Sequence, residues 1–149
     1  TADRSIAMMD IALRRRFEFT EIMPDPTLVV SDKFGFNFQD IFTLLNQKIS
    51  VLHGKDYQIG HSYFMDDKIS TIAELKRAWF GSLLPLLNEY FYEEWDKLKA
   101  LVKGFITESP AVKGLEGVHF GKSELFDFAE SDMSDEEFVT LMKSIESAE

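Results

Sequence analysis

Three consecutive arginines near the start of the chain are the side chains best placed to do chemistry. Arg14, Arg15 and Arg16 follow a short stretch with helical apolar spacing and precede an apolar, strand-like run. A guanidinium is a permanently charged planar fork, so it can stabilise charge that develops on a transferring phosphoryl group. Basic residues at a helix end are also common because they satisfy terminal carbonyls and the helix dipole. Spacing alone therefore favours the capping role and leaves phosphate chemistry as the alternative.

A histidine in a loop of glycine and aromatic residues is the next candidate. Residues 60–64 read Gly-His-Ser-Tyr-Phe, and His61 can donate a hydrogen bond to a ligand, although a structural role is slightly favoured. His53 and His119 are distant in sequence, and no pair of histidines has the one-turn spacing that favours a shared metal. We therefore predict no metal site.

A second motif resembles the end of a phosphate-binding loop. Gly121-Lys122-Ser123 has the right residue types, but Glu116 stands where the first glycine of the motif is required. A carboxylate at that position repels phosphate, and neither a preceding strand nor a following apolar helix is evident. The match is interpreted as coincidence.

The composition indicates a globular domain with an acidic surface. The 149 residues are 45% hydrophobic and 13% aromatic, which is ample for a packed core, and no window approaches a membrane span. The net charge of -10 opposes nonspecific DNA binding, because an acidic surface repels phosphate. Cysteine is absent, which excludes disulfides and is compatible with a cytoplasmic location. The first residue is Thr, so we expect a fragment of a longer polypeptide.

The elements that position these side chains are mostly helical. We expect a short helix before the arginines and a strand over 17–22, ended by Pro24-Asp25-Pro26. A helix over 38–52 is predicted from its apolar face, with Gly54 as its stop.

Two further helices are predicted from capping signals. Thr71 and Glu74 have the spacing of a capping box and open a helical region to about Lys103, which Pro85 should kink or split into two abutting helices. Ser134, with Glu137 at the box position, begins a final helix whose apolar stripe is Phe138, Leu141, Met142 and Ile145.

Three ordered motifs resemble landmarks of one known family. They are Thr1-Ala2-Asp3-Arg4-Ser5 followed by Asp10-Ile11-Ala12-Leu13-Arg14-Arg15-Arg16-Phe17, then residues 59–64, then Pro85-Leu86-Leu87-Asn88-Glu89-Tyr90-Phe91. Together they resemble the McrB-type subunit of 5-methylcytosine-specific restriction systems, which belongs to the AAA+ NTPases. The resemblance covers about residues 1 to 100.

The resemblance implies roles for six residues. Arg15 and Arg16 would be the catalytic arginine fingers that act on a nucleotide held by a neighbouring subunit. Contacts to the nucleotide would come from a further set of residues, which is Asp3, Arg14, His61 and Ser62. The phosphate loop and the magnesium-binding acids would lie upstream of Thr1, so this fragment should not hydrolyse nucleotide by itself.

The resemblance also implies an architecture and partners. The expected fold is mainly α: a remnant of the AAA+ core over 1–26, a helical lid over 33–104 and an acidic C-terminal extension over 105–149. The intact protein would be a GTP- or NTP-hydrolysing subunit of a hexamer. It would use Mg, work with an McrC-type nuclease and act on methylated DNA. The alternative from the residues alone is a non-enzymatic acidic helical module that binds a partner protein.

Overall fold

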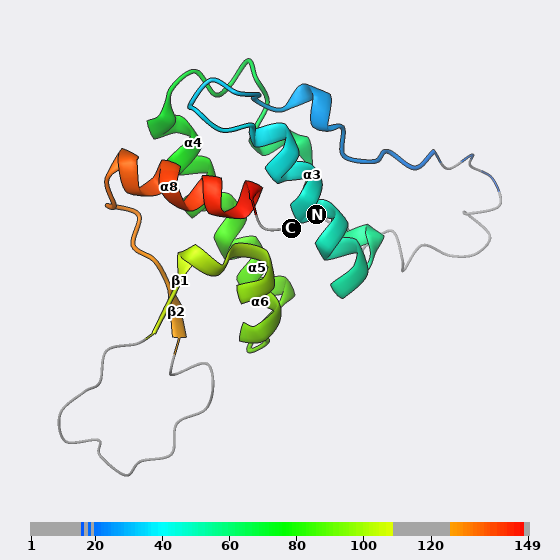
Figure 1. Ribbon diagram of the computed structural model, residues 1–149. Helices are drawn as coiled ribbons and strands as arrows, with labels where there is room; N and C mark the ends of the chain where they lie inside the picture. Colours follow the sequence, from blue (N-terminus) through cyan, green and yellow to red (C-terminus); the bar gives the residue numbers. More distant parts are fainter. Residues whose placement is uncertain (1–15, 17, 19, 109–125, 148–149) are drawn as a thin grey trace, which may run out of the picture.

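The computed structural model describes residues 16, 18, 20–108 and 126–147. Within these ranges the chain is mainly helical, as expected, and has one small antiparallel sheet (Figure 1). The helices are α3 (Phe38–Leu52), α4 (Ile72–Ala78), α5 (Leu84–Tyr90), α6 (Trp95–Val102) and α8 (Asp135–Glu146). The strands are β1 (Ile106–Glu108) and β2 (Phe126–Phe128), in a register that pairs Thr107 with Asp127.

Helix α3 forms as its apolar spacing predicts. The Asn37 side chain caps it by accepting a hydrogen bond from the Gln39 amide at 3.1 Å. Its buried face consists of Phe38, Ile41, Phe42, Leu45, Asn46 and Ile49. The helix ends at Leu52, and Gly54 follows with a φ of 125°, a conformation that glycine adopts without the strain of a side chain. The predicted stop is confirmed.

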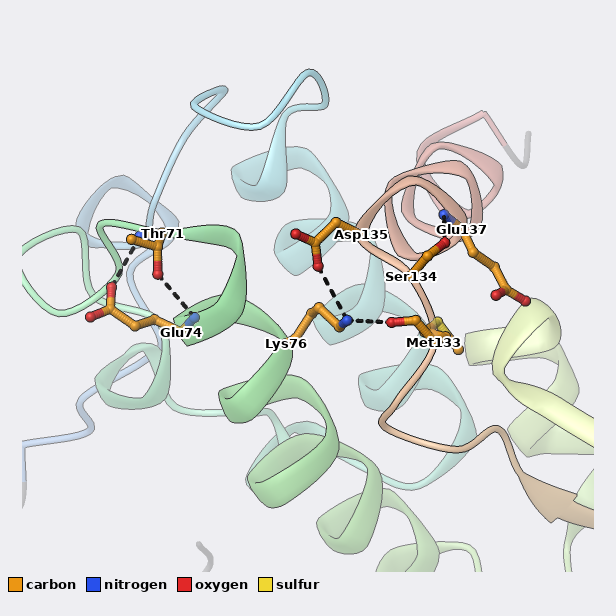
Figure 2. Close-up of polar contacts among 7 residues, drawn as sticks. All are labelled: Thr71, Glu74, Lys76, Met133, Ser134, Asp135 and Glu137. Atoms are coloured by element: carbon orange, nitrogen blue, oxygen red, sulfur yellow. Dashed lines mark hydrogen bonds and ion pairs between the residues drawn. The ribbon is translucent and has the colours of Figure 1, made fainter.

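The capping box that opens α4 is also confirmed. The Glu74 amide donates to the Thr71 hydroxyl at 3.3 Å, and the Glu74 carboxylate accepts from the Thr71 amide at 3.0 Å (Figure 2). The same carboxylate oxygen accepts from the Ser70 amide at 2.7 Å. These backbone hydrogen bonds, from Ser70 first and then Thr71, lower the pKa of the Glu74 carboxyl.

The expected interruption at Pro85 takes the form of a π-helical turn, η4 (Trp79–Leu83), which joins α4 to α5. The Leu84 amide donates to the Trp79 carbonyl five residues earlier. Proline has no amide hydrogen and its ring clashes with the carbonyl four residues before it, so the wider turn lets Pro85 enter the first turn of α5. Two abutting helices result.

The prediction of continuous helix from Pro85 to about Lys103 is wrong. The chain leaves the helix at Phe91 and resumes it at Trp95, and Glu93 takes a φ of 61° in between. The Glu94 amide donates to the Phe91 carbonyl and closes this turn. Phe91 and Trp95 are both buried on either side of it, so the turn lets two large side chains enter the same core.

The predicted strand over 17–22 is not formed in its described part. Residues 18 and 20–25 have no regular secondary structure. No described strand lies beside them, and an isolated extended segment has no partner for its backbone groups. The helix expected before the arginines lies outside the described residues. None of the described helices is both long and apolar enough to cross a membrane.

Helix α8 packs into the same core as the preceding helices. The ring of Phe138 lies 6.4 Å from that of Trp79 and 5.8 Å from that of Phe105, and all three side chains are fully buried. Ser134 caps the helix as predicted by accepting from the Glu137 amide at 3.1 Å (Figure 2). Of the predicted stripe, Phe138, Met142 and Ile145 are buried and Leu141 is half-buried.

Aromatic contacts hold β2 against α6, and β1 pairs with β2. The Trp95 ring lies 5.8 Å from the ring of Phe126 and 5.9 Å from that of Phe128. The ammonium of Lys99, one turn along α6 from Trp95, stands 3.5 Å above the Phe126 ring. The start and the end of the region 105–149 therefore both contact the helices of the predicted lid.

Phe138→Ala should lower the free energy of unfolding by about 3–5 kcal/mol, because it removes a ring packed against three other aromatic rings and leaves a cavity. Urea denaturation of the chain checks this. Thr140→Ala, at an exposed position of the same helix, is the control and should change the value by about 0.5 kcal/mol or less. Equal midpoints for Phe138→Ala and the wild type would show that α8 is not part of the core.

Glu74→Gln should destabilise the chain at neutral pH and much less in acid. The folded-state pKa of Glu74 lies below its ordinary value, so its stabilising effect is present above the unfolded pKa and is lost as pH falls through the folded pKa. Urea midpoints of wild type and variant should therefore differ at about pH 7, and the difference should shrink as the pH falls below about 4, the ordinary pKa of a glutamate. A difference of constant size across that range would contradict the role given to the carboxylate.

Candidate functional site

A buried asparagine positions the loop that contains the predicted site residues. The Asn46 side chain, on α3, accepts from the Ile59 amide at 2.6 Å and donates to the Ile59 carbonyl at 3.0 Å. Ile59 is buried and lies outside the helices and strands, so its backbone N–H and C=O need other partners. The Asn46 side chain provides both. Ile59 is fixed against α3 two residues before His61.

The other end of this loop is tied to the segment before α3. The Val30 amide donates to the Phe64 carbonyl at 2.9 Å, and the Asp66 amide donates to the Leu28 carbonyl at 3.0 Å. Phe64 is fully buried, and its ring lies 4.8 Å from that of Phe38. The loop is therefore held on both sides of the short 3-10 turn η3 (His61–Tyr63).

His61 contacts the proline-flanked segment that precedes the helices. Its Nδ1 accepts a hydrogen bond from the Asp25 amide at 3.1 Å, and the ring is half-buried. An accepting Nδ1 bears no hydrogen, so the neutral ring has its proton on Nε2. That second nitrogen is a donor suited to an oxygen of a ligand.

The Asp25 carboxylate has its own partners. The Thr27 hydroxyl donates to it at 2.7 Å and the Thr27 amide at 2.9 Å, which caps the 3-10 turn η1 (Pro26–Leu28). These two hydrogen bonds lower the pKa of the Asp25 carboxyl. Four residues earlier, Glu21 pairs with Lys55 at 2.9 Å across the same junction. We call residues 21–27 the linker.

Ser62 differs from His61 in having an exposed side chain. Its carbonyl accepts from the Lys68 ammonium at 3.1 Å, so its backbone belongs to the loop while its hydroxyl faces outward. His61 and Ser62 together offer an imidazole N–H and a hydroxyl on one turn. Both groups can donate to an anion.

Three of the six predicted site residues, Asp3, Arg14 and Arg15, lie outside the described residues. Arg16 is described and exposed. Their roles stay predictions. The linker contact of His61 was not predicted, because a bond between residues 36 positions apart leaves no local pattern. Pro24-Asp25-Pro26 was interpreted as the end of a strand and of the core remnant, not as a partner of His61, and its stiffness was the available signal.

Metal binding was not expected from the histidine spacing. In the ranges that the structure describes, no three His, Asp or Glu side chains are grouped as metal ligands.

A known family model matches the part of the chain that contains α3, the loop with His61, α4 and α5. Residues 37–99, from the cap of α3 into α6, match the family model of the McrB alpha-helical lid domain. This segment is a McrB-type lid. His61 and Ser62 lie inside it, whereas the linker and α8 lie outside it. The resemblance inferred from the motifs is therefore confirmed for the lid.

A curated relative supports the same assignment. The chain is 36% identical to the Type IV methyl-directed restriction enzyme EcoKMcrB subunit of Escherichia coli (strain K12). The aligned region covers 63% of this chain and 24% of that protein. The chain thus spans about a quarter of the length of this relative. The domain boundaries at 26, 33 and 104 remain predictions.

Asn46→Ala should destabilise the chain by about 1–3 kcal/mol, because it leaves the buried amide and carbonyl of Ile59 without partners. Gln47→Ala, at the exposed neighbouring position, is the matched control and should be near neutral. Urea denaturation measures both. Amide hydrogen exchange of Ile59 should also accelerate in Asn46→Ala. An unchanged exchange rate of the Ile59 amide would contradict the hydrogen bonds assigned to the Asn46 side chain.

Proposed function

We propose that this chain is the lid-bearing part of an NTP-hydrolysing AAA+ motor subunit in a methylation-dependent DNA restriction system. The match of residues 37–99 to the McrB lid is the observation on which the proposal rests. The relative's description as a methyl-directed restriction enzyme subunit supports the biological setting. The methylated base would be 5-methylcytosine, as the family resemblance implies.

In this proposal Arg15 and Arg16 are arginine fingers that act in trans. Each guanidinium would stabilise the charge that develops on the phosphoryl group of a nucleotide bound by the neighbouring subunit. The hydrogen bond to His61 holds Asp25 on the lid. Arg16 precedes Asp25 by nine residues, so it lies at most about 30 Å from this attachment point. Movement of the lid would therefore act on the arginines through the linker.

The nucleotide contacts proposed for this chain are Asp3, Arg14, His61 and Ser62. The donor set fits an anion, because the Nε2–H of neutral His61 and the Ser62 hydroxyl both donate from η3. A bound nucleotide with Mg would supply the phosphoryl group and the cation that neutralises it. The family resemblance implies that the nucleotide is GTP. The residues of this chain do not discriminate between GTP and ATP.

The proposed assembly is a ring of six identical subunits that works with an McrC-type nuclease. DNA would be bound by the intact protein rather than by this acidic part, because its net charge of -10 repels phosphate. A non-enzymatic interaction module is the alternative, and it predicts no dependence on nucleotide.

A complementation experiment on the intact subunit tests action in trans. One variant combines Arg15→Ala with Arg16→Ala, and the other lacks the phosphate-loop lysine that we expect upstream. Each homogeneous ring should hydrolyse GTP at a small fraction of the normal rate. In a one-to-one mixture about a quarter of interfaces join an intact phosphate loop to an intact arginine pair, so activity should recover to about that fraction.

The control is Lys143→Ala, which removes an exposed cation of α8 and should leave GTP turnover unchanged. Full activity in the double arginine variant would refute the finger assignment. Loss of activity without recovery in mixed rings would refute action in trans. Ring formation is followed by sedimentation in every case, so a variant that fails to assemble is recognised.

A further inference from the structure

A groove with a volume of about 780 Å³ is lined by residues that belong neither to the linker nor to η3. One wall is the outer face of α4, η4 and α5, and the other is the segment from β2 to α8, drawn in orange in Figure 1. The helical wall presents an exposed row at intervals of three or four residues, which is Ala73, Arg77, Gly81, Pro85 and Asn88. The groove is therefore open along a helix.

Neither steric crowding nor backbone conformation in the described chain requires a glycine at position 81. A Cβ built on Gly81 meets no atom within 4 Å, and the residue does not have the positive φ that would require glycine. Glycine inside a helix is less stable than alanine, so its presence in η4 indicates a role outside the chain's own packing. A missing side chain lets another backbone approach closely, and π-helical turns are frequent at functional sites.

The charge of the groove is opposite to that of the chain. Its lining has Lys76 and Arg77 against Asp135, a net charge of +1 in a chain of net charge -10. The Lys76 ammonium donates to the Met133 carbonyl and pairs with Asp135 at 3.2 Å, which ties the two walls together (Figure 2). Arg77 is exposed, and no described carboxylate lies within ion-pair distance of its guanidinium.

The floor of the groove is apolar. Leu84 is buried there, and half-buried Phe80 and Phe128 line it from opposite walls. The charge of Glu74 on the same helix acts on Arg77, but the two side chains form no ion pair, so the exposed guanidinium can still bind a ligand. An apolar floor beside this guanidinium fits a ligand that has both apolar and acidic side chains. The small residues on the helical wall, Ala73 and Gly81, leave room for a wide ligand such as a helix.

We propose that this groove binds an amphipathic helix of another protein, with its apolar stripe on Phe80, Leu84 and Phe128 and an acidic side chain paired with Arg77. The partner helix passes over Gly81, where the lack of a side chain sets the depth of the groove. This interaction goes beyond the proposed nucleotide chemistry and does not depend on it.

The test uses the isotope-labelled 149-residue chain and two synthetic amphipathic peptides of about four helical turns. Both have a leucine stripe, flanked by glutamates in one peptide and by lysines in the other. The glutamate peptide should shift the amide resonances of Ala73, Gly81 and Asn88 in nuclear magnetic resonance spectra. It should bind at least about tenfold more tightly than the lysine peptide.

Two variants make the test specific to the groove. Gly81→Leu should abolish binding of the glutamate peptide while keeping the fold, because its side chain enters open space. Arg77→Glu should weaken binding by about tenfold or more. Thr140→Leu and Lys143→Glu, on exposed positions of α8 outside the groove, are the matched controls and should bind like the wild type.

Equal binding of the two peptides, full binding by Gly81→Leu or no binding of the glutamate peptide at millimolar concentration would overturn the proposal. Shifts of the groove resonances that appear on concentrating the chain without peptide would also overturn it, because they would assign the groove to a second copy of this chain. The far-ultraviolet circular dichroism spectrum confirms that each variant is folded.

Discussion

The structure depends on one buried aromatic contact, the packing of Trp79 against three phenylalanines. Trp79 is fully buried in the π-helical turn between α4 and α5, with its ring 6.4 Å from Phe38, 5.1 Å from Phe105 and 6.4 Å from Phe138. These partners come from α3, from the turn η5 (Lys103–Phe105) and from α8. Large aromatic side chains bury much apolar area and prefer such inclined arrangements. Elements far apart in sequence thereby share one core.

That core determines where the polar groups of the candidate site lie. The buried face of α3 packs on the aromatic cluster, and Asn46 on the same helix fixes Ile59. Phe64 enters the core three residues after His61, so the short turn between them is held from both ends. His61 then binds the Asp25 amide of the linker. A chain of contacts therefore runs from the packed lid to the segment that follows the arginines.

The helices could be predicted where local signals set them. Thr71 with Glu74, Ser134 and Pro85 each act through neighbouring backbone groups, and the structure has a cap or an interruption at each. The turn at Glu93 could not be predicted, since glutamate does not favour a φ of 61° and only the burial of Phe91 and Trp95 selects it. The contact of His61 with Asp25 and the packing of α8 on Trp79 join residues far apart in sequence. The apolar periodicity of the sequence predicts neither.

The proposed function rests on what the lid holds in place. Residues 37–99 match the McrB lid, and in the proposed function the arginines would act on a phosphate that a neighbouring subunit presents. The structure of the intact ring with GDP and aluminium fluoride tests this most directly. The account predicts a guanidinium of Arg15 or Arg16 about 3 Å from a fluoride of the neighbouring subunit's analogue. Both arginines bound to carbonyls of their own subunit, beside an occupied site, would contradict it.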